Sequence, residues 1–164
     1  MKIFLSIVAV FFFSTAFCQH YLENNEKLIF SFDTQNEKKL VLAKDSNNLY
    51  IVYRFGTKDK IEFEFPENNK DSWSKFKYSF YMRGGGVQNE GMDLDYVYFS
   101  NNGFQYIIYN TYYASENKVT IGVKIVDSKT NKTTNIKGIL KSRKGALADF
   151  RNNNLLKITD ELPE

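Results

Sequence analysis

The sequence contains one cysteine and one histidine, Cys18 and His20, and both lie within its first twenty residues. If the chain is cleaved after residue 18, the folded body has no thiol and can form no disulfide. It also has no imidazole for a Ser-His-Asp triad, a proton shuttle or a zinc site. Most common hydrolase mechanisms are therefore disfavoured, no cofactor is expected, and apolar packing must hold the fold.

The chain also has little excess charge of either sign. The formal net charge is +3, one unit less without Lys2, and the charges are interspersed through the chain. This mild balance does not predict nucleic-acid binding. The chain has a large apolar content, with 43% hydrophobic residues that include 11 Tyr and 15 Phe. A packed core is therefore expected, and the length fits one domain.

Residues 1–18 have the pattern of a signal peptide. Lys2 is followed by an apolar run over residues 3–13 and by Ala16-Phe17-Cys18, a small-x-small cleavage site. The run is too short to span a bilayer, so we expect cleavage before Gln19 and export to the periplasm or the extracellular space of a bacterium. The alternative is lipid attachment at Cys18, which the bulky Phe17 disfavours. The mature chain then has one β domain at 19–158 and a flexible tail at 159–164, with no transmembrane segment.

Alternation of apolar and polar residues with a period of two dominates the mature chain and predicts β-strands. Asn102-Gly103 between two such runs predicts a tight hairpin, because both residues tolerate positive φ. We expect an all-β, single-domain antiparallel β-sandwich or β-barrel of about 8–10 short strands. The strands are expected near residues 28–32, 39–43, 49–55, 61–65, 76–83, 92–99, 104–113, 119–125, 133–137 and 155–158.

A glycine-rich segment over residues 83–91 interrupts this pattern. Three consecutive glycines give the backbone unusual freedom and allow a ligand or another chain to approach closely. The alternative is a wide hairpin loop or a bulge that bends the sheet. The candidate contact residues in and beside it are Tyr81, Arg83, Gly84, Gly85, Gly86, Asn89 and Glu90.

Two aspartates follow the glycine-rich segment. Asp93 and Asp95 share one strand face, because they are two residues apart. With Glu90 they are candidate calcium ligands or a carboxylate pair for catalysis. The alternatives are a solvated strand face that discourages edge-to-edge aggregation, or pairing with Arg83, Lys75 or Lys77 across the sheet.

Tyrosines crowd the hairpin that spans residues 96–113, on both of its faces. Only one face can join a core, so Tyr109 and Tyr113 on the other face are candidates for contact with a partner. The alternative is a two-sheet sandwich in which both faces of this hairpin are largely covered.

These features predict an exported, non-enzymatic binding or envelope-associated module, which contacts an envelope or extracellular protein or glycan. The rival is a hydrolase of envelope carbohydrate with a carboxylate pair drawn from Glu62, Glu64, Glu90, Asp93 and Asp95. A purely structural envelope protein is a third hypothesis. Small exported β-barrels that inhibit lysozyme are similar in compartment, size and class, but share no motif with this chain, so they illustrate only one form of the binding hypothesis. The oligomeric state is not predicted.

Overall fold

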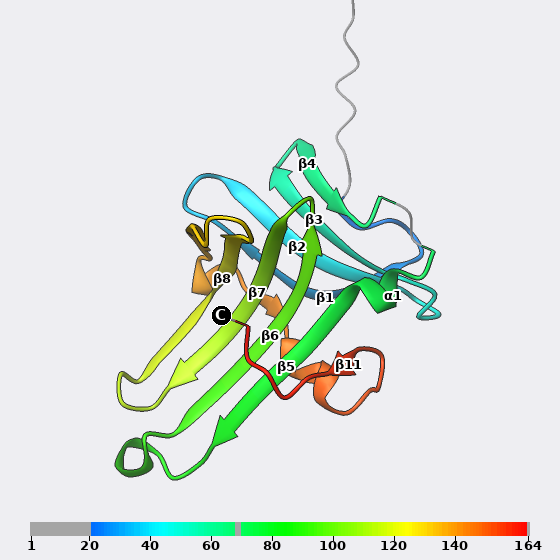
Figure 1. Cartoon of the computed structure of the whole chain (residues 1–164). Coiled ribbons are helices and arrows are strands. Elements are labelled where there is room, and N and C mark those ends of the chain that lie inside the picture. Colours follow the sequence, from blue (N-terminus) through cyan, green and yellow to red (C-terminus); the bar gives the residue numbers. More distant parts are fainter. Residues whose placement is uncertain (1–20, 68–69, 164) are drawn as a thin grey trace, which may run out of the picture.

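The chain forms two β-sheets that pack face to face (Figure 1). The structure, a computed structural model, describes residues 21–67 and 70–163. The expected signal peptide, Cys18, Gln19 and His20 lie outside the described residues. One sheet has the strand order β10-β1-β2-β3-β4, and the other has the order β11-β5-β6-β7-β8-β9.

The alternating segments fall where the sequence pattern places them. The five-stranded sheet contains β1 (Glu26–Asp33), β2 (Lys38–Asp45), β3 (Ile51–Thr57), β4 (Lys60–Phe65) and β10 (Lys144–Gly145). The six-stranded sheet contains β5 (Phe76–Arg83), β6 (Met92–Asn101), β7 (Phe104–Tyr113), β8 (Lys118–Asp127), β9 (Thr133–Lys137) and β11 (Lys157–Ile158). Short helical turns connect them: α1 (Ser72–Lys75), η1 (Val87–Asn89), η2 (Leu140–Ser142) and η3 (Leu147–Arg151).

The β6–β7 hairpin confirms the strongest turn prediction. Asn101 pairs with Phe104, and the two residues between them have positive φ, 50° at Asn102 and 81° at Gly103. An Asn-Gly step adopts this geometry at low cost, and its twist matches that of the flanking strands. The turn therefore fixes the register of β6 on β7, and with it the face that each tyrosine occupies.

The structure narrows the predicted fold class to a sandwich. The two sheets do not close into a barrel, and pairing is not wholly antiparallel, because β11 runs parallel to β5. Eleven strands are present in the described residues, two of them only two residues long. After β9 the chain returns to the first sheet, and Gly138 there forms an isolated bridge with Thr34, the residue that follows β1.

A cluster of aromatic rings joins the two sheets, with Phe99 of β6 at its centre. Its ring stacks on Phe65, with centroids 4.3 Å apart, and on Tyr106 at 4.9 Å. Tyr53 and Phe76 pack against it at 5.2 Å and 5.0 Å. Phe65 and Tyr53 come from the first sheet and the other rings from the second. Packing within this cluster therefore holds the two sheets together.

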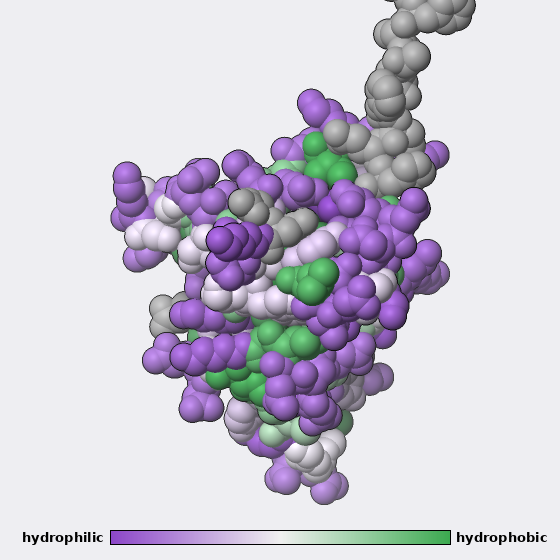
Figure 2. Space-filling view, turned by 90° about the vertical axis from the view of Figure 1, so that its right-hand side faces the viewer, coloured by the Kyte–Doolittle hydropathy of each residue, from purple (hydrophilic) through white to green (hydrophobic). Residues whose placement is uncertain are grey.

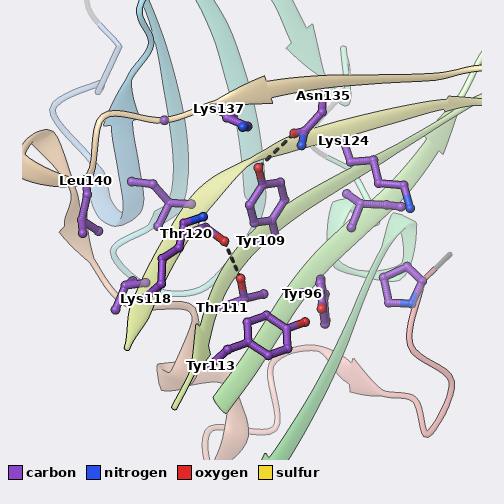
Figure 3. Close-up of a pocket in the computed structure, with 15 residues that line it drawn as sticks. Tyr96, Tyr109, Thr111, Tyr113, Lys118, Thr120, Lys124, Asn135, Lys137 and Leu140 are labelled. Carbon is purple, nitrogen blue, oxygen red and sulfur yellow. Dashed lines mark hydrogen bonds between the residues drawn. The ribbon is translucent and has the colours of Figure 1, made fainter. Parts of the chain in front are cut away.

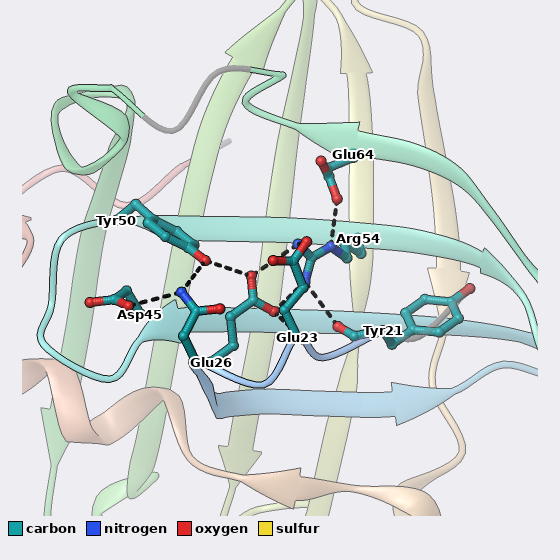
Figure 4. Close-up of polar contacts among 8 residues, drawn as sticks. Tyr21, Glu23, Glu26, Asp45, Tyr50, Arg54 and Glu64 are labelled. Carbon is teal, nitrogen blue, oxygen red and sulfur yellow. Dashed lines mark hydrogen bonds and ion pairs between the residues drawn. The ribbon is translucent and has the colours of Figure 1, made fainter. Parts of the chain in front are cut away.

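Arg54 is the centre of a cluster of polar contacts on the outer face of the five-stranded sheet (Figure 4). Its guanidinium donates to the Glu26 carboxylate, with Nη2 2.9 Å from Oε1, and to the Tyr21 carbonyl at 3.0 Å. It also pairs with Glu64 of β4. Burial opposes ionisation of Glu26, but hydrogen bonds from Arg54 and the backbone outweigh it and lower the pKa of this carboxyl. The cluster ties the segment before β1 to the sheet.

The remaining surface is largely polar. On the side that carries α1 and β11, hydrophilic residues surround a few separate apolar areas (Figure 2). No helix within the described ranges is long and apolar enough to cross a membrane.

Replacing Phe99 with alanine should lower the free energy of unfolding by about 3–5 kcal/mol, because the cavity would lie between both sheets. Urea denaturation measures this loss. Phe104→Ala is the matched control, since that ring is 40% exposed at the hairpin tip and should cost about 1 kcal/mol or less. Equal losses in the two variants would contradict a central role for Phe99.

The Glu26→Gln variant should be less stable than the wild type by about 3–5 kcal/mol at pH 7, because it leaves the Arg54 guanidinium without its buried partner. The folded-state pKa of Glu26 is below the ordinary value of 4.5. The contribution of Glu26 to the free energy of unfolding is therefore fully present above pH 4.5. It is lost as the pH falls through the lowered pKa of the folded state. Denaturation curves from pH 7 to pH 3 should show the difference shrinking in that acidic range. A constant difference would contradict the assignment, and Glu62→Gln, an exposed ion-pair residue, provides the control.

Candidate functional site

The outer face of the six-stranded sheet carries a hollow of about 410 Å³ (Figure 3). Strands β6, β7, β8 and β9 form its floor, and η2 borders it with Leu140. Tyrosines, hydroxyls and lysines dominate the lining, chiefly Tyr96, Tyr109, Tyr113, Lys118, Lys124 and Lys137.

Strand register gathers these side chains from distant parts of the sequence. Tyr96 of β6 pairs with Tyr109 of β7, Tyr109 with Gly122 of β8, and Gly122 with Lys137 of β9. Paired residues point to the same face of a sheet. One row across four strands therefore places the two tyrosine rings, the bare backbone of Gly122 and the ammonium group of Lys137 side by side.

Gly122 determines how the Tyr109 ring lies. A Cβ at this glycine would be 2.6 Å from the Tyr109 Cζ and would overlap the hydroxyl oxygen. The ring thus crosses β8 directly over Gly122, and its hydroxyl donates to Asn135 Oδ1 of β9 at 2.9 Å (Figure 3). The Tyr109 ring also lines the hollow. Such a ring is suited to stacking on a flat apolar ligand surface.

Hydroxyl groups surround this ring. Thr111 and Thr120 are hydrogen-bonded across β7 and β8, with their Oγ1 atoms 2.7 Å apart. Burial and the neighbouring Tyr113 hydroxyl raise the pKa of Tyr96 to about 12. Tyr96 is therefore neutral at physiological pH and can donate or accept hydrogen bonds.

The charge in the hollow is positive. Within residues 21–67 and 70–163, Lys124 and Lys137 take part in no ion pair, and Lys118 is 3.6 Å from Glu116, a loose exposed pair. The strand residues that share this face include no aspartate or glutamate. An anionic ligand would therefore meet ammonium groups whose strand neighbours on this face carry no carboxylate.

The glycine-rich segment forms a separate site at the end of β5 and β6. Arg83 closes the loop, since its Nη2 donates to the Glu90 carbonyl at 2.9 Å and to the carboxylate at 3.1 Å. Gly85 and Gly86 have positive φ, and the Asn89 side chain packs against Gly85. The structure thus brings Arg83, Gly84, Gly86 and Asp93 to one hollow of about 390 Å³. Tyr81 is exposed on the outer face, where it pairs with Leu94.

A solvated strand face was one of the sequence interpretations, and it is wrong for Asp95, whereas the side chain of Asp93 is 49% exposed. Asp95 is 1% exposed and accepts hydrogen bonds from Tyr78 and Arg151, and Asp93 is also paired with Arg151. The basic residue that pairs with both aspartates is Arg151 of η3, and not Arg83, Lys75 or Lys77 across the sheet. Sequence could not show this, because Arg151 is 56 residues from Asp95 and lies outside any alternating segment.

Ion pairs also engage the other carboxylates considered for catalysis. Glu62 pairs with Lys38, Glu64 with Arg54, and Glu90 with Arg83. Across the described residues, no group of three His, Cys, Asp or Glu side chains is arranged to hold a metal ion.

The candidate residues therefore divide between two places. Tyr109 and Tyr113 line the hollow on the sheet, whereas the glycine-loop candidates lie at the sheet end. Sequence reasoning missed Lys124, Asn135 and Gly122. The signal for Gly122 was present, because a glycine inside an alternating strand often marks a close approach of another group. Comparisons of this chain with protein-family models, with curated proteins and with solved structures found no match.

Gly122→Ala should destabilise the protein by about 1–3 kcal/mol, because the new methyl group collides with Tyr109 and with the Ile136 carbonyl. In a Tyr109→Ala background the loss should be smaller, because one of the two obstacles is gone. A double-mutant cycle by urea denaturation measures this coupling. Strict additivity would show that the ring does not lie over the glycine.

Proposed function

We propose that the chain is an exported, non-enzymatic binding module that holds an acidic glycan in the hollow on the six-stranded sheet. The observation that carries the proposal is the Tyr109 ring, whose hydroxyl end lies over Gly122 in a hollow that is also lined by hydroxyls and lysines. Export is inferred from the pattern of residues 1–18, and the periplasm and the extracellular space both fit it.

The chemistry of a sugar matches each part of this surface. The apolar face of a pyranose ring stacks on tyrosine, and its hydroxyls can bond to Asn135 and Thr120. Carboxylates on an acidic sugar would be bound by Lys124 and Lys137, in a shallow site where water screens the attraction only partly. The volume of about 410 Å³ lies within the ordinary range of ligand sites.

The hydrolase alternative has less support. Its mechanism needs two carboxyl groups that act as acid and as base or nucleophile, one of them with a raised pKa. All five candidate carboxylates are instead engaged with lysine or arginine. The hollow itself is lined by no carboxylate.

Isothermal titration calorimetry with galacturonate tetrasaccharide, and with the neutral N-acetylglucosamine tetrasaccharide, tests the proposal. We expect binding of the acidic sugar that weakens as salt rises. Tyr109→Ala should weaken binding by about 0.5–1.5 kcal/mol, roughly 2- to 12-fold, and Tyr109→Phe, which keeps the ring, much less.

Lys124→Gln should reduce affinity for the acidic sugar, and Lys27→Gln, an exposed lysine on β1, should not. If neither sugar binds, or if Tyr109→Ala and Lys124→Gln behave like the wild type, the proposed site is wrong. A structural role in the envelope would then be favoured.

A further inference from the structure

The segment that follows β11 lies on the same outer face as the hollow (Figure 1). Sequence reasoning treated residues 159–164 as a flexible tail. In the structure, Thr159 donates its N–H to the Tyr78 carbonyl at 2.9 Å, and its hydroxyl is 2.7 Å from that of Tyr98. From this anchor the chain leaves the sheet edge and turns across the face.

Two outward-pointing residues are covered although no sheet formed by the described residues packs on this face. Tyr98 and Ile107 are paired neighbours on β6 and β7, and they are only 8% and 1% exposed. Glu161, Leu162 and Pro163 border a hollow with Tyr98. Pro163 also lines the main hollow, together with Ile107. The segment therefore extends into one end of the proposed binding site.

Its composition complements the face on which it lies. Asp160 and Glu161 bring negative charge to a face that carries Lys77 and Lys124. Its hold beyond Thr159 is weak, since Asp160 and Glu161 form no ion pair with any residue in the described ranges, and Leu162 remains 41% exposed. A segment held mainly at one end can be displaced by a ligand that binds the same face better.

We propose that residues 160–163 are an internal, displaceable occupant of this site, which lowers its apparent affinity for acidic glycans until a ligand displaces them. This inference rests on the proposed function. An occupied fraction of 90% would reduce apparent affinity tenfold, since only the open fraction binds. The acidic residues act through charge, and Leu162 and Pro163 through the apolar area that they cover.

The test compares the full chain with a chain that ends after Thr159, each titrated with galacturonate tetrasaccharide. The shortened chain should bind about tenfold more tightly. A synthetic peptide of residues 159–163 should compete with the sugar for the shortened chain. The double variant Asp160→Asn/Glu161→Gln keeps the whole backbone and should show a smaller gain in affinity, which guards against a folding defect in the shortened chain.

NMR spectra of the two forms without ligand give a second readout. Removal of the segment should shift the resonances of Tyr98 and Ile107, and leave those of Phe104 at the hairpin tip unchanged. Equal affinities of the two chains for the sugar would overturn the occluding role and leave the binding function standing. Absence of binding by either chain would overturn both proposals, and unchanged Tyr98 and Ile107 resonances would show that the segment does not cover the face.

Discussion

The packing of aromatic rings around Phe99 is the interaction on which the rest of the structure depends. The described residues contain no cysteine, so no disulfide bond between them links the two sheets. The rings of Phe65 and Tyr106 both stack on the Phe99 ring and are nearly parallel to it. Because one stack includes strands of both layers, it fixes which face of β6 and β7 is internal. The opposite face, with Tyr109, is then necessarily turned away from the core.

Two arginines hold segments in place through ion pairs, in addition to the apolar packing of the core. Arg54 fastens the segment before β1 to the outer side of the first sheet, and Arg151 fastens η3 to the carboxylates of β6. Both guanidinium groups are engaged by acids that would otherwise be buried without a partner. This arrangement uses most of the acidic groups near the core for structure. Within the described residues, Lys124 and Lys137 of the hollow form no ion pair, which gives the outer face of the second sheet its positive character.

Local patterning predicted the strands well, because period-two alternation and Asn-Gly turns depend only on neighbouring residues. The β6–β7 hairpin is an example, with the division of its tyrosines between two faces. The prediction failed where partners are distant in sequence. Asp95 looked like a polar strand residue, and only the docking of η3 shows that it is buried against Arg151. The choice of sandwich over barrel likewise depends on which strand edges meet after β9.

The sequence by itself determined that the residues after His20 contain no cysteine or histidine, have the strand pattern of a β domain and carry tyrosines on both faces of one hairpin. Those properties follow from composition and from short-range periodicity. Only the tertiary structure decided that Tyr109 lies over Gly122 beside Asn135 and Lys137, and that the segment after β11 reaches the same face. The physical reason is that strand register and sheet order are set by non-local packing, which brings together side chains that no local pattern relates.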